Sequence, residues 1–156
     1  LERWVTDKNI LFQYSGTYFH YPITREQLSD YLEKHPERRF FIGYTQDHGP
    51  YAFGEIIPKG TQPPRLARLL IGDPEMRGIG LGQFFVRELI SMATELFHPR
   101  AIDLFVLADN TGAIRCYQKV GFHFLPEGDF ELQFEGKAFP VRKMRLNLEA
   151  EHPTSF

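Results

Sequence analysis

The sequence predicts an α/β fold whose sheet is mixed and mostly antiparallel, with one parallel strand pair and flanking helices. Apolar residues recur at helical spacing over residues 80–97, apolar strand-like runs lie before and after that segment, and further β-rich runs lie on both sides. A strand, a helix and a strand in this order make a right-handed crossover between parallel strands. The 156 residues fit a single domain, 1–156.

The first predicted helix begins at a capping box. Thr24 is followed three residues later by Gln27, so the helix is expected to run to about Lys34 before Pro36 ends it. Its expected buried stripe is Leu28, Tyr31 and Leu32.

Three strands follow this helix. Residues 39–45 and 51–57 are β-rich and are separated by turn residues, which indicates an antiparallel hairpin. A third strand, 65–71, ends at Gly72, Asp73 and Pro74, since proline cannot donate to a strand ladder. A glycine-rich segment begins directly after it.

The second half of the chain begins with the long helix over 80–97, which His98 and Pro99 end. Residues 101–107 form the strand expected to run parallel to 65–71. Asp109 and Asn110 can then cap a second helix that ends at Gly121, a residue suited to a left-handed C-terminal position. The runs 122–125, 130–134 and 139–148 are predicted to be antiparallel strands.

Composition and charge limit the partners of this chain. Hydrophobic residues make up 42% and the net charge is −2 without a long run of like charge, so the chain is predicted to be globular and not to bind nucleic acid. The single cysteine, Cys116, excludes an internal disulfide and is predicted to be a small hydrophobic residue. No membrane span or signal sequence is recognised, and the expected location is the cytoplasm.

Residues 76–83 combine a strand end, an arginine and three alternating glycines at the start of a helix. Such a turn lets the backbone approach a ligand, and the free N–H groups of the helix start favour phosphate. The spacing matches neither a Walker A loop nor the dinucleotide fingerprint. The alternative is that these glycines form only a tight turn.

In this context the segment resembles the glycine motif of the GNAT superfamily of N-acyltransferases, Arg/Gln-x-x-Gly-x-Gly/Ala, which Arg77, Gly80 and Gly82 match. Residues 110–122 resemble the family's second signature, Asn-x-x-Ala-x-x-x-Tyr-x-x-x-Gly-Phe, with every signature residue in register. The resemblance covers roughly residues 39–148 and implies acetyl-CoA as the co-substrate.

By this resemblance, backbone N–H groups of the turn bind the pyrophosphate of acyl-CoA, and the end of strand 65–71 pairs with the pantetheine arm. Asn110 is expected to hydrogen-bond that arm, to cap its helix, or to do both. The residues expected to bind the cofactor are Leu70, Ile71, Gly72, Arg77, Gly78, Ile79, Gly80, Leu81, Gly82, Gln83, Asn110 and Tyr117.

Two residues are predicted to be catalytic. The phenol of Tyr117 is suited to protonate a departing thiolate, because its ordinary pKa of about 10 is close to the ~8.5 of a thiol. Its alternative role is that of a core tyrosine. Glu55 is the best-placed carboxylate for removing a proton from the amine, and its alternative is a solvated strand residue.

The acceptor side is less defined by the sequence. Arg68 faces either an anionic acceptor or solvent, and Tyr14, Tyr18 and Tyr21 lie in a predicted loop where they line the acceptor site or only pack. Residues 1–5 are expected to be the end of the family's first helix, whose preceding strand is missing from this sequence. The histidines, His152 included, show no metal-ligand spacing, so no metal is predicted.

The predicted function is transfer of an acetyl group from acetyl-CoA to a primary amine by direct attack. The acceptor is expected to be a small molecule or a peptide, and the chain a monomer or a homodimer. The alternatives are a non-catalytic acyl-CoA sensor and a binding module for another phosphate ligand.

Overall fold

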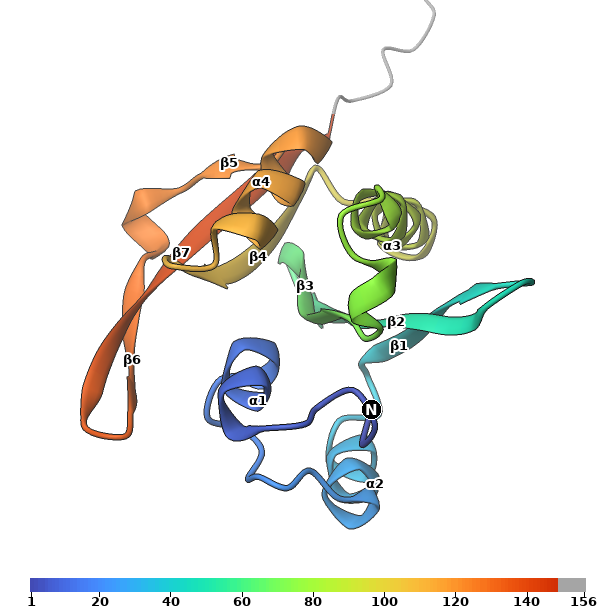
Figure 1. Cartoon of the computed structure of the whole chain (residues 1–156). Helices are drawn as coiled ribbons and strands as arrows, with labels where there is room; N and C mark the ends of the chain where they lie inside the picture. The colour runs from blue at the N-terminus through green and yellow to red at the C-terminus, as the bar shows by residue number, and fades with distance from the viewer. Residues whose placement is uncertain (149–156) are drawn as a thin grey trace, which may run out of the picture.

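The computed structural model describes residues 1–148, in which seven strands form one sheet in the order β1-β2-β3-β4-β7-β5, with β6 paired to β7. In chain order the elements are α1 (Lys8–Ser15), α2 (Arg25–Lys34), β1 (Arg39–Thr45), β2 (Gly49–Lys59), β3 (Gln62–Ile71), the 3₁₀ helix η1 (Pro74–Met76), α3 (Leu81–Phe97), β4 (Ala101–Leu107), α4 (Thr111–Val120), β5 (His123–Phe124), the 3₁₀ helix η2 (Pro126–Gly128), β6 (Phe130–Phe134) and β7 (Lys137–Asn147). Helices cover both faces of the sheet (Figure 1).

The sheet is mixed in the way the sequence predicts. Strands β3 and β4 run parallel, and the other pairs within the described residues are antiparallel. The helix α3 connects the parallel pair. The predicted fold class is therefore confirmed.

The predicted helix caps are also present. The Thr24 hydroxyl accepts a hydrogen bond from the Gln27 N–H at 3.2 Å, and Asn110 Oδ1 accepts one from the Ala113 N–H at 3.3 Å. Gly121 ends α4 in the left-handed conformation, with φ 119°. These local signals fix where the helices begin and end.

The two parallel strands are paired only over a short stretch. The register joins Arg65 to Asp103 and Leu66 to Leu104, and no later pair follows within the described chain. Beyond this point β3 contains a bulge, because Gly54 of β2 lies opposite two residues, Arg68 and Leu69, where the register shifts. The strands β3 and β4 therefore separate toward their carboxyl ends.

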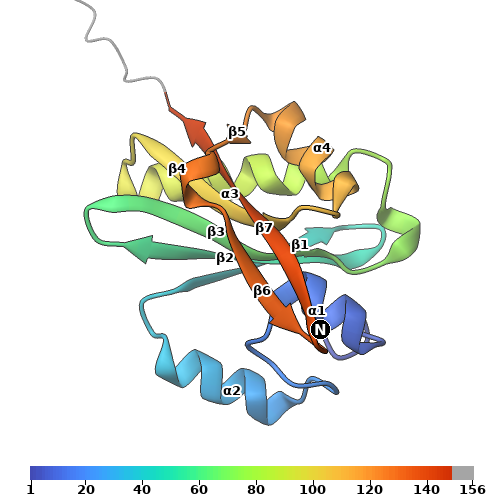
Figure 2. The same ribbon diagram turned by 90° about the vertical axis from the view of Figure 1, so that its left-hand side faces the viewer.

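One face of the sheet carries α3 and α4 (Figure 2). The main hydrophobic core lies there and includes Leu66, Leu89, Leu104 and Met144, each no more than 1% exposed. This packing holds the start of α3 and the start of α4 close to the ends of β3 and β4.

The opposite face carries α1 and α2 (Figure 2). A second core joins Leu11 and Tyr14 of α1 and Tyr31 of α2 to partly buried Phe53 and Leu70 of the sheet. In the predicted buried stripe of α2, Tyr31 is buried and Leu28 is partly buried. Leu32 is 48% exposed, so the prediction that it is buried is wrong.

The N-terminal prediction also needs correction. Residues 1–5 form a single turn, in which the Trp4 and Val5 N–H groups donate to the Leu1 carbonyl, and not the end of a helix. The first helix is α1, which begins after Asp7, because Asp7 Oδ1 accepts from two backbone N–H groups at 2.8 Å. Tyr14 therefore lies on a helix and not in a loop.

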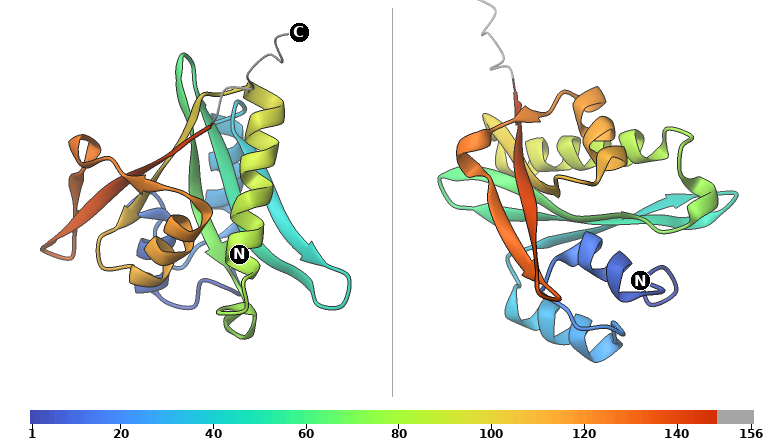
Figure 3. Two further views of the ribbon diagram at one scale, coloured as in Figure 1. Left: turned by 90° about the horizontal axis from the view of Figure 1, so that it is seen from above. Right: turned by 60° about the vertical axis from the view of Figure 1, so that its left-hand side comes forward.

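The hairpin of β6 and β7 leaves the plane of the sheet and reaches α1 (Figure 3). The ring of Phe12 on α1 stacks on the ring of Phe134, with centroids 4.3 Å apart. Phe12 also packs with Leu107 and Val141 in a third buried cluster. The hairpin and α1 thus form one wall beside the separated strands.

Candidate active site

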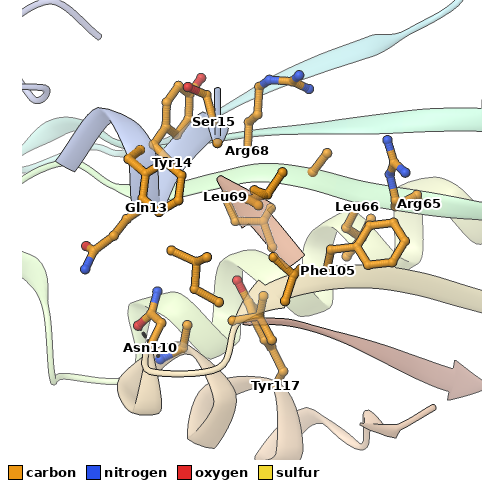
Figure 4. A pocket seen from close by; sticks show the side chains of 18 of the residues that line it. Gln13, Tyr14, Ser15, Arg65, Leu66, Arg68, Leu69, Phe105, Asn110 and Tyr117 are labelled. Carbon is orange, nitrogen blue, oxygen red and sulfur yellow. Dashed lines mark hydrogen bonds between the residues drawn. The ribbon is translucent and has the colours of Figure 1, made fainter. Parts of the chain in front are cut away.

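A pocket of about 210 Å³ lies where β3 and β4 separate (Figure 4). Its lining comes from β3, from β4, from the start of α4, from the end of α1 and from the hairpin of β6 and β7. Asn110 and Tyr117 lie on one side of it, whereas Gln13, Tyr14 and Ser15 lie on the other side. The lining therefore includes residues from elements on both faces of the sheet.

Tyr117 is buried, with 8% of its surface exposed, and its hydroxyl points from α4 toward the gap between the strands (Figure 4). Burial raises the pKa of Tyr117 above its ordinary value, and Cys116 beside it contributes in the same direction. The phenol therefore stays protonated at neutral pH. The structure places this predicted residue in the pocket and at the edge of the core at the same time.

Asn110 is the N-cap of α4 and lines the same pocket. Its Oδ1 is occupied by the Ala113 N–H, so its amide nitrogen remains to donate to a ligand. Capping is therefore confirmed, and the position is compatible with the second role as well.

The glycine-rich turn has the geometry of an anion cradle. Gly78 and Gly80 have φ of 75° and 86°, in the left-handed region, and no atom lies within 4 Å of where a Cβ would be. Gly80 is the N-cap of α3 and makes no side-chain cap hydrogen bond, so the first N–H groups of that helix have no cap acceptor. These groups and the helix dipole fit a pyrophosphate.

The remaining turn residues, Ile79, Leu81, Gly82 and Gln83, surround this helix start. A Cβ on Gly82 would lie 3.5 Å from Cys116 Sγ on α4, which is ordinary contact. The turn and α4 therefore adjoin, although no residue of the turn is among the described residues that line the gap pocket. Cys116 is half-buried and burial raises the pKa of its thiol, as expected of a packing residue.

Arg77 connects the turn to the end of β3. Its Nε donates to the Ile71 carbonyl at 3.0 Å, and its side chain is exposed. The Gly72 N–H donates to the Tyr51 carbonyl at 2.8 Å, so Gly72 and Leu70 face β2 while Ile71 faces the open side. Among the three predicted strand-end residues, Ile71 is the one whose backbone groups point away from β2.

Gly72 is also needed for close packing. A Cβ at this position would lie 1.8 Å from Cδ2 of Trp4, so the indole ring lies directly against the strand backbone. The N-terminal turn is therefore packed against the end of β3.

Glu55 lies in a buried ionic cluster and not at the surface. It is 0% exposed, and its Oε1 accepts hydrogen bonds from Tyr31 Oη at 2.7 Å and from Arg68 Nη1, with Arg38 Nη1 at 3.7 Å. The alternative of a solvated strand residue is therefore wrong. The solvent-facing alternative for Arg68 is wrong for the same reason, because Arg68 is ion-paired with Glu55.

The cluster adjoins a second cavity of about 150 Å³ between α1, α2 and the sheet. Glu55 lines this cavity and does not line the gap pocket, whereas Tyr14 and Arg68 line both. Glu55 Oε2 has no hydrogen-bond partner within residues 1–148. The role of Glu55 as a base stays a prediction.

The three N-terminal tyrosines have different positions. Tyr14 is buried and lines the gap pocket, and burial raises its pKa. Tyr18 is 44% exposed and its hydroxyl lies 3.0 Å from His35 Nε2. Tyr21 donates its hydroxyl to the Thr6 carbonyl at 2.8 Å.

Sequence reasoning missed several lining residues. Gln13 and Ser15 lie on α1, a helix not predicted from the sequence, although Asp7 followed by apolar Leu11 and Phe12 is a helix start signal. Arg65 lines the pocket from the paired part of β3. No local pattern distinguishes this arginine from a solvated one.

Some kinds of site are absent from the described part of the chain. Within residues 1–148, no helix combines the length and the apolar character needed to cross a membrane. The same residues contain no group of three or more His, Cys, Asp or Glu side chains arranged to hold a metal ion. His152 lies outside the described residues.

An anion cradle at the start of α3, next to a strand gap into which a phenol points, defines an acyl-CoA-dependent N-acyltransferase. Residues 7–122 match the model of the acetyltransferase (GNAT) family. The chain therefore belongs to the GNAT family, and it transfers an acetyl group from acetyl-CoA to an amine.

Two kinds of relative agree with this assignment. A spermine/spermidine N(1)-acetyltransferase of Bacillus subtilis (strain 168) is 28% identical over 125 residues, which cover 78% of this chain and 80% of the relative. The crystal structure of a spermidine N-acetyltransferase from Vibrio cholerae in complex with CoA and spermine has a TM-score of 0.75 at 18% identity, covering 94% of this chain and 86% of that one.

A third comparison concerns assembly. A dodecameric structure of spermidine N-acetyltransferase from Vibrio cholerae has a TM-score of 0.65 at 20% identity, covering 80% of this chain and 74% of that one. The comparisons give no support to the sensor alternative. A monomer or a homodimer stays a prediction for this chain.

Proposed function

We propose that this chain acetylates the primary amine of a small molecule or peptide by direct attack in the gap between β3 and β4, with Tyr117 as the general acid. The observation that carries the proposal is the Tyr117 hydroxyl, which points into the gap from the side of α4. When bound, acetyl-CoA supplies a thioester whose carbonyl carbon gains the C–N bond while the C–S bond breaks.

The cofactor is placed on the face of α3 and α4. Backbone N–H groups of residues 78–83 hold the pyrophosphate and Arg77 adds a positive charge, while Ile71 and Asn110 hold the pantetheine arm. This arrangement directs the arm along the open edge of β3 toward Tyr117.

Tyr117 then donates its phenolic proton to the departing sulfur, and the proton that the nitrogen loses as it becomes an amide returns the phenolate to the phenol. Its raised pKa keeps the phenol protonated in the resting enzyme and also makes it a weaker acid than a free tyrosine, so the proton moves as negative charge develops on the sulfur. The attacking ammonium must lose its proton first, because the lone pair is needed for attack. Glu55 is the proposed base, because its Oε2 has no hydrogen-bond partner within residues 1–148. Since Glu55 lines the neighbouring cavity and not the gap pocket, it takes the proton through a chain of water molecules.

The amine enters from the face of α1. Gln13, Tyr14 and Ser15 line that side, with Phe130 and Leu132 of the hairpin. Spermine and spermidine are the first acceptors to test, because the curated relatives that cover most of this chain carry those names.

The experiment is a screen of amines with measurement of free CoA. We expect release of one CoA for each acetylated amine, and mass spectrometry should find the acetyl group on the nitrogen. Stabilisation by acetyl-CoA without CoA release from any amine would contradict the proposal.

A further inference from the structure

Arginine side chains gather beside the gap on the face that carries α1 and α2. Arg65 and Arg68 line the gap pocket, and Arg68 also donates to Tyr31 Oη at 2.9 Å, as does Arg38. Figure 4 shows the Arg65 and Arg68 side chains on the side of α1, across β3 from Tyr117. The side from which the amine enters is therefore cationic.

The bulge in β3 places Arg68 there. Leu66, Leu69 and Ile71 pack in the core under α3, whereas Leu70 packs in the core under α1 and α2. In a regular strand the side chain at 68 would face α3 with Leu66. The extra residue, with φ 49°, turns Arg68 to the face of Arg65.

Carboxylates on this face do not balance these charges. Glu55 is shared by Arg68 and Arg38. Asp103, which lies opposite Arg65 in the parallel pair, is held by Arg145 through two hydrogen bonds of 2.7 and 2.9 Å. No Asp or Glu is found among the pocket-lining residues in the described part of the chain.

The Arg65 guanidinium is available to bind an anion. None of the ion pairs found within residues 1–148 includes it, and its guanidinium lies over the ring of Phe105, 5.1 Å from the centroid. Burial, followed by the charges of Arg38 and Arg68, lowers the pKa of Arg65. A bound anion would relieve this repulsion.

We infer that the acceptor amine carries a carboxylate, which Arg65 binds beside the Glu55-paired Arg68 while the amine enters the gap toward Tyr117. The inference rests on the proposed function and narrows its substrate class. A planar guanidinium matches a carboxylate through two parallel hydrogen bonds, so Arg65 gives both orientation and selectivity. Phe105 and Phe130 supply apolar contact for the chain between the two groups.

This substrate class differs from the acceptors named for the curated relatives. Spermine and spermidine are polycations, and binding them next to two arginines without a carboxylate in the lining places like charges together. The acceptor preference of this chain is therefore expected to favour the anionic amine.

The test uses matched acceptors. A series of ω-amino acids from glycine to ε-aminocaproate is compared with the corresponding amides, with spermidine in the same assay. In ε-aminocaproate the carboxylate is far from the amine, so the basicity of the amine is nearly the same in the acid and the amide. We expect the preferred acid to exceed its amide by roughly tenfold or more in kcat/KM, mainly through KM.

The matched variants are Arg65→Gln and Arg100→Gln. Arg65→Gln should bring the ratio of acid to amide toward unity, whereas Arg100→Gln, which removes an exposed guanidinium outside the pocket, should keep it. Arg65 has no ion-pair partner within residues 1–148 to lose, so the variant is expected to fold.

The possible results distinguish failure of the carboxylate inference from failure of the proposed function. Equal use of acids and amides, or preference for spermidine, overturns the carboxylate inference and leaves acetyl transfer intact. Absence of CoA release with every amine, while acetyl-CoA still raises Tm, overturns the proposed function and this inference with it.

Discussion

The Tyr31 hydroxyl donates to Glu55 Oε1 at 2.7 Å, and this hydrogen bond joins α2 to the middle of the sheet. Arg68 shares the same oxygen from the bulge in β3, so a helix and two strands converge on one buried carboxylate. Removal of that charge would leave two arginines without their buried partner, which costs more than the pair itself contributes.

We therefore expect Glu55→Gln to lower the free energy of unfolding by about 3–5 kcal/mol, measured by urea denaturation. Glu131→Gln, at an exposed position on β6, is the control. The opposite result would be an unchanged free energy of unfolding with a lower kcat and loss of the acid limb of the profile of kcat against pH. It would show that Glu55 removes the proton and does not stabilise the fold.

Tyr117→Phe tests the general acid. The variant should lower kcat by roughly a hundredfold or more, because a positioned acid contributes at least this factor. The affinity for acetyl-CoA, measured by calorimetry, should be nearly unchanged. Tyr51→Phe removes a hydroxyl from another buried tyrosine outside the gap pocket and should keep kcat. Normal turnover by Tyr117→Phe would exclude this residue from the chemistry.

Arg77 should govern affinity and not turnover. Arg77→Ala removes the guanidinium that adjoins the glycine turn, so KM for acetyl-CoA should rise roughly tenfold while kcat stays close to its original value. Added salt should weaken the effect, because the side chain is exposed. Arg100→Ala is the control, and an equal rise in KM there would count against a specific role for Arg77.

Stability should fall in alkaline solution. Burial raises the pKa of Tyr14 and of Tyr117 above the ordinary 10.0, so above that pH the unfolded chain releases phenolic protons that the folded chain keeps. The free energy of unfolding is then unaffected below about pH 10 and falls above it by up to about 1.4 kcal/mol per pH unit for each tyrosine.

Denaturation at a series of pH values measures this slope. Tyr14→Phe and Tyr117→Phe should each make the slope shallower. Tyr44→Phe, which alters a ring that is 70% exposed, serves as the control for removing a tyrosine. A slope that is the same in all three variants would disagree with the assignment to buried phenols.

Gly72→Ala should destabilise the fold by about 1–3 kcal/mol, because its Cβ would overlap the Trp4 ring. The same substitution should cost much less in a Trp4→Ala background, where the ring is absent. A double-mutant cycle on thermal unfolding measures the difference. Purely additive effects would show that the indole does not lie against this strand in solution.

Much of the architecture is carried by local sequence signals. Thr24 and Asn110 cap their helices with their own side chains, and Gly121 ends α4 through its positive φ. The crossover through α3 follows from periodicity and chain direction. These signals are enough to place the glycine turn and the Tyr117 segment at adjacent strand ends.

The acceptor side depends on contacts between distant parts of the chain. Nothing next to Arg68 indicates a residue with φ 49°, and Glu55 is buried only because α2 and β3 both bring partners to it. The helix α1 has only eight residues, and its packing on the hairpin through Phe12 stabilises it more than its own sequence does. These relationships are tertiary and leave little local pattern.

The inserted residue at Arg68 reverses which face of the sheet the following side chains of β3 point to. This reversal has two consequences for the site. The inserted residue lies where β3 and β4 separate, at the proposed position of the thioester, and it turns a guanidinium toward the proposed entrance of the amine. A redesign that restored a regular strand would therefore be expected to close the gap between β3 and β4 and to change the selectivity for the acceptor amine. Engineering of acceptor choice should instead target α1 and the β6–β7 hairpin, whose exposed positions can vary without shifting the phase of the sheet.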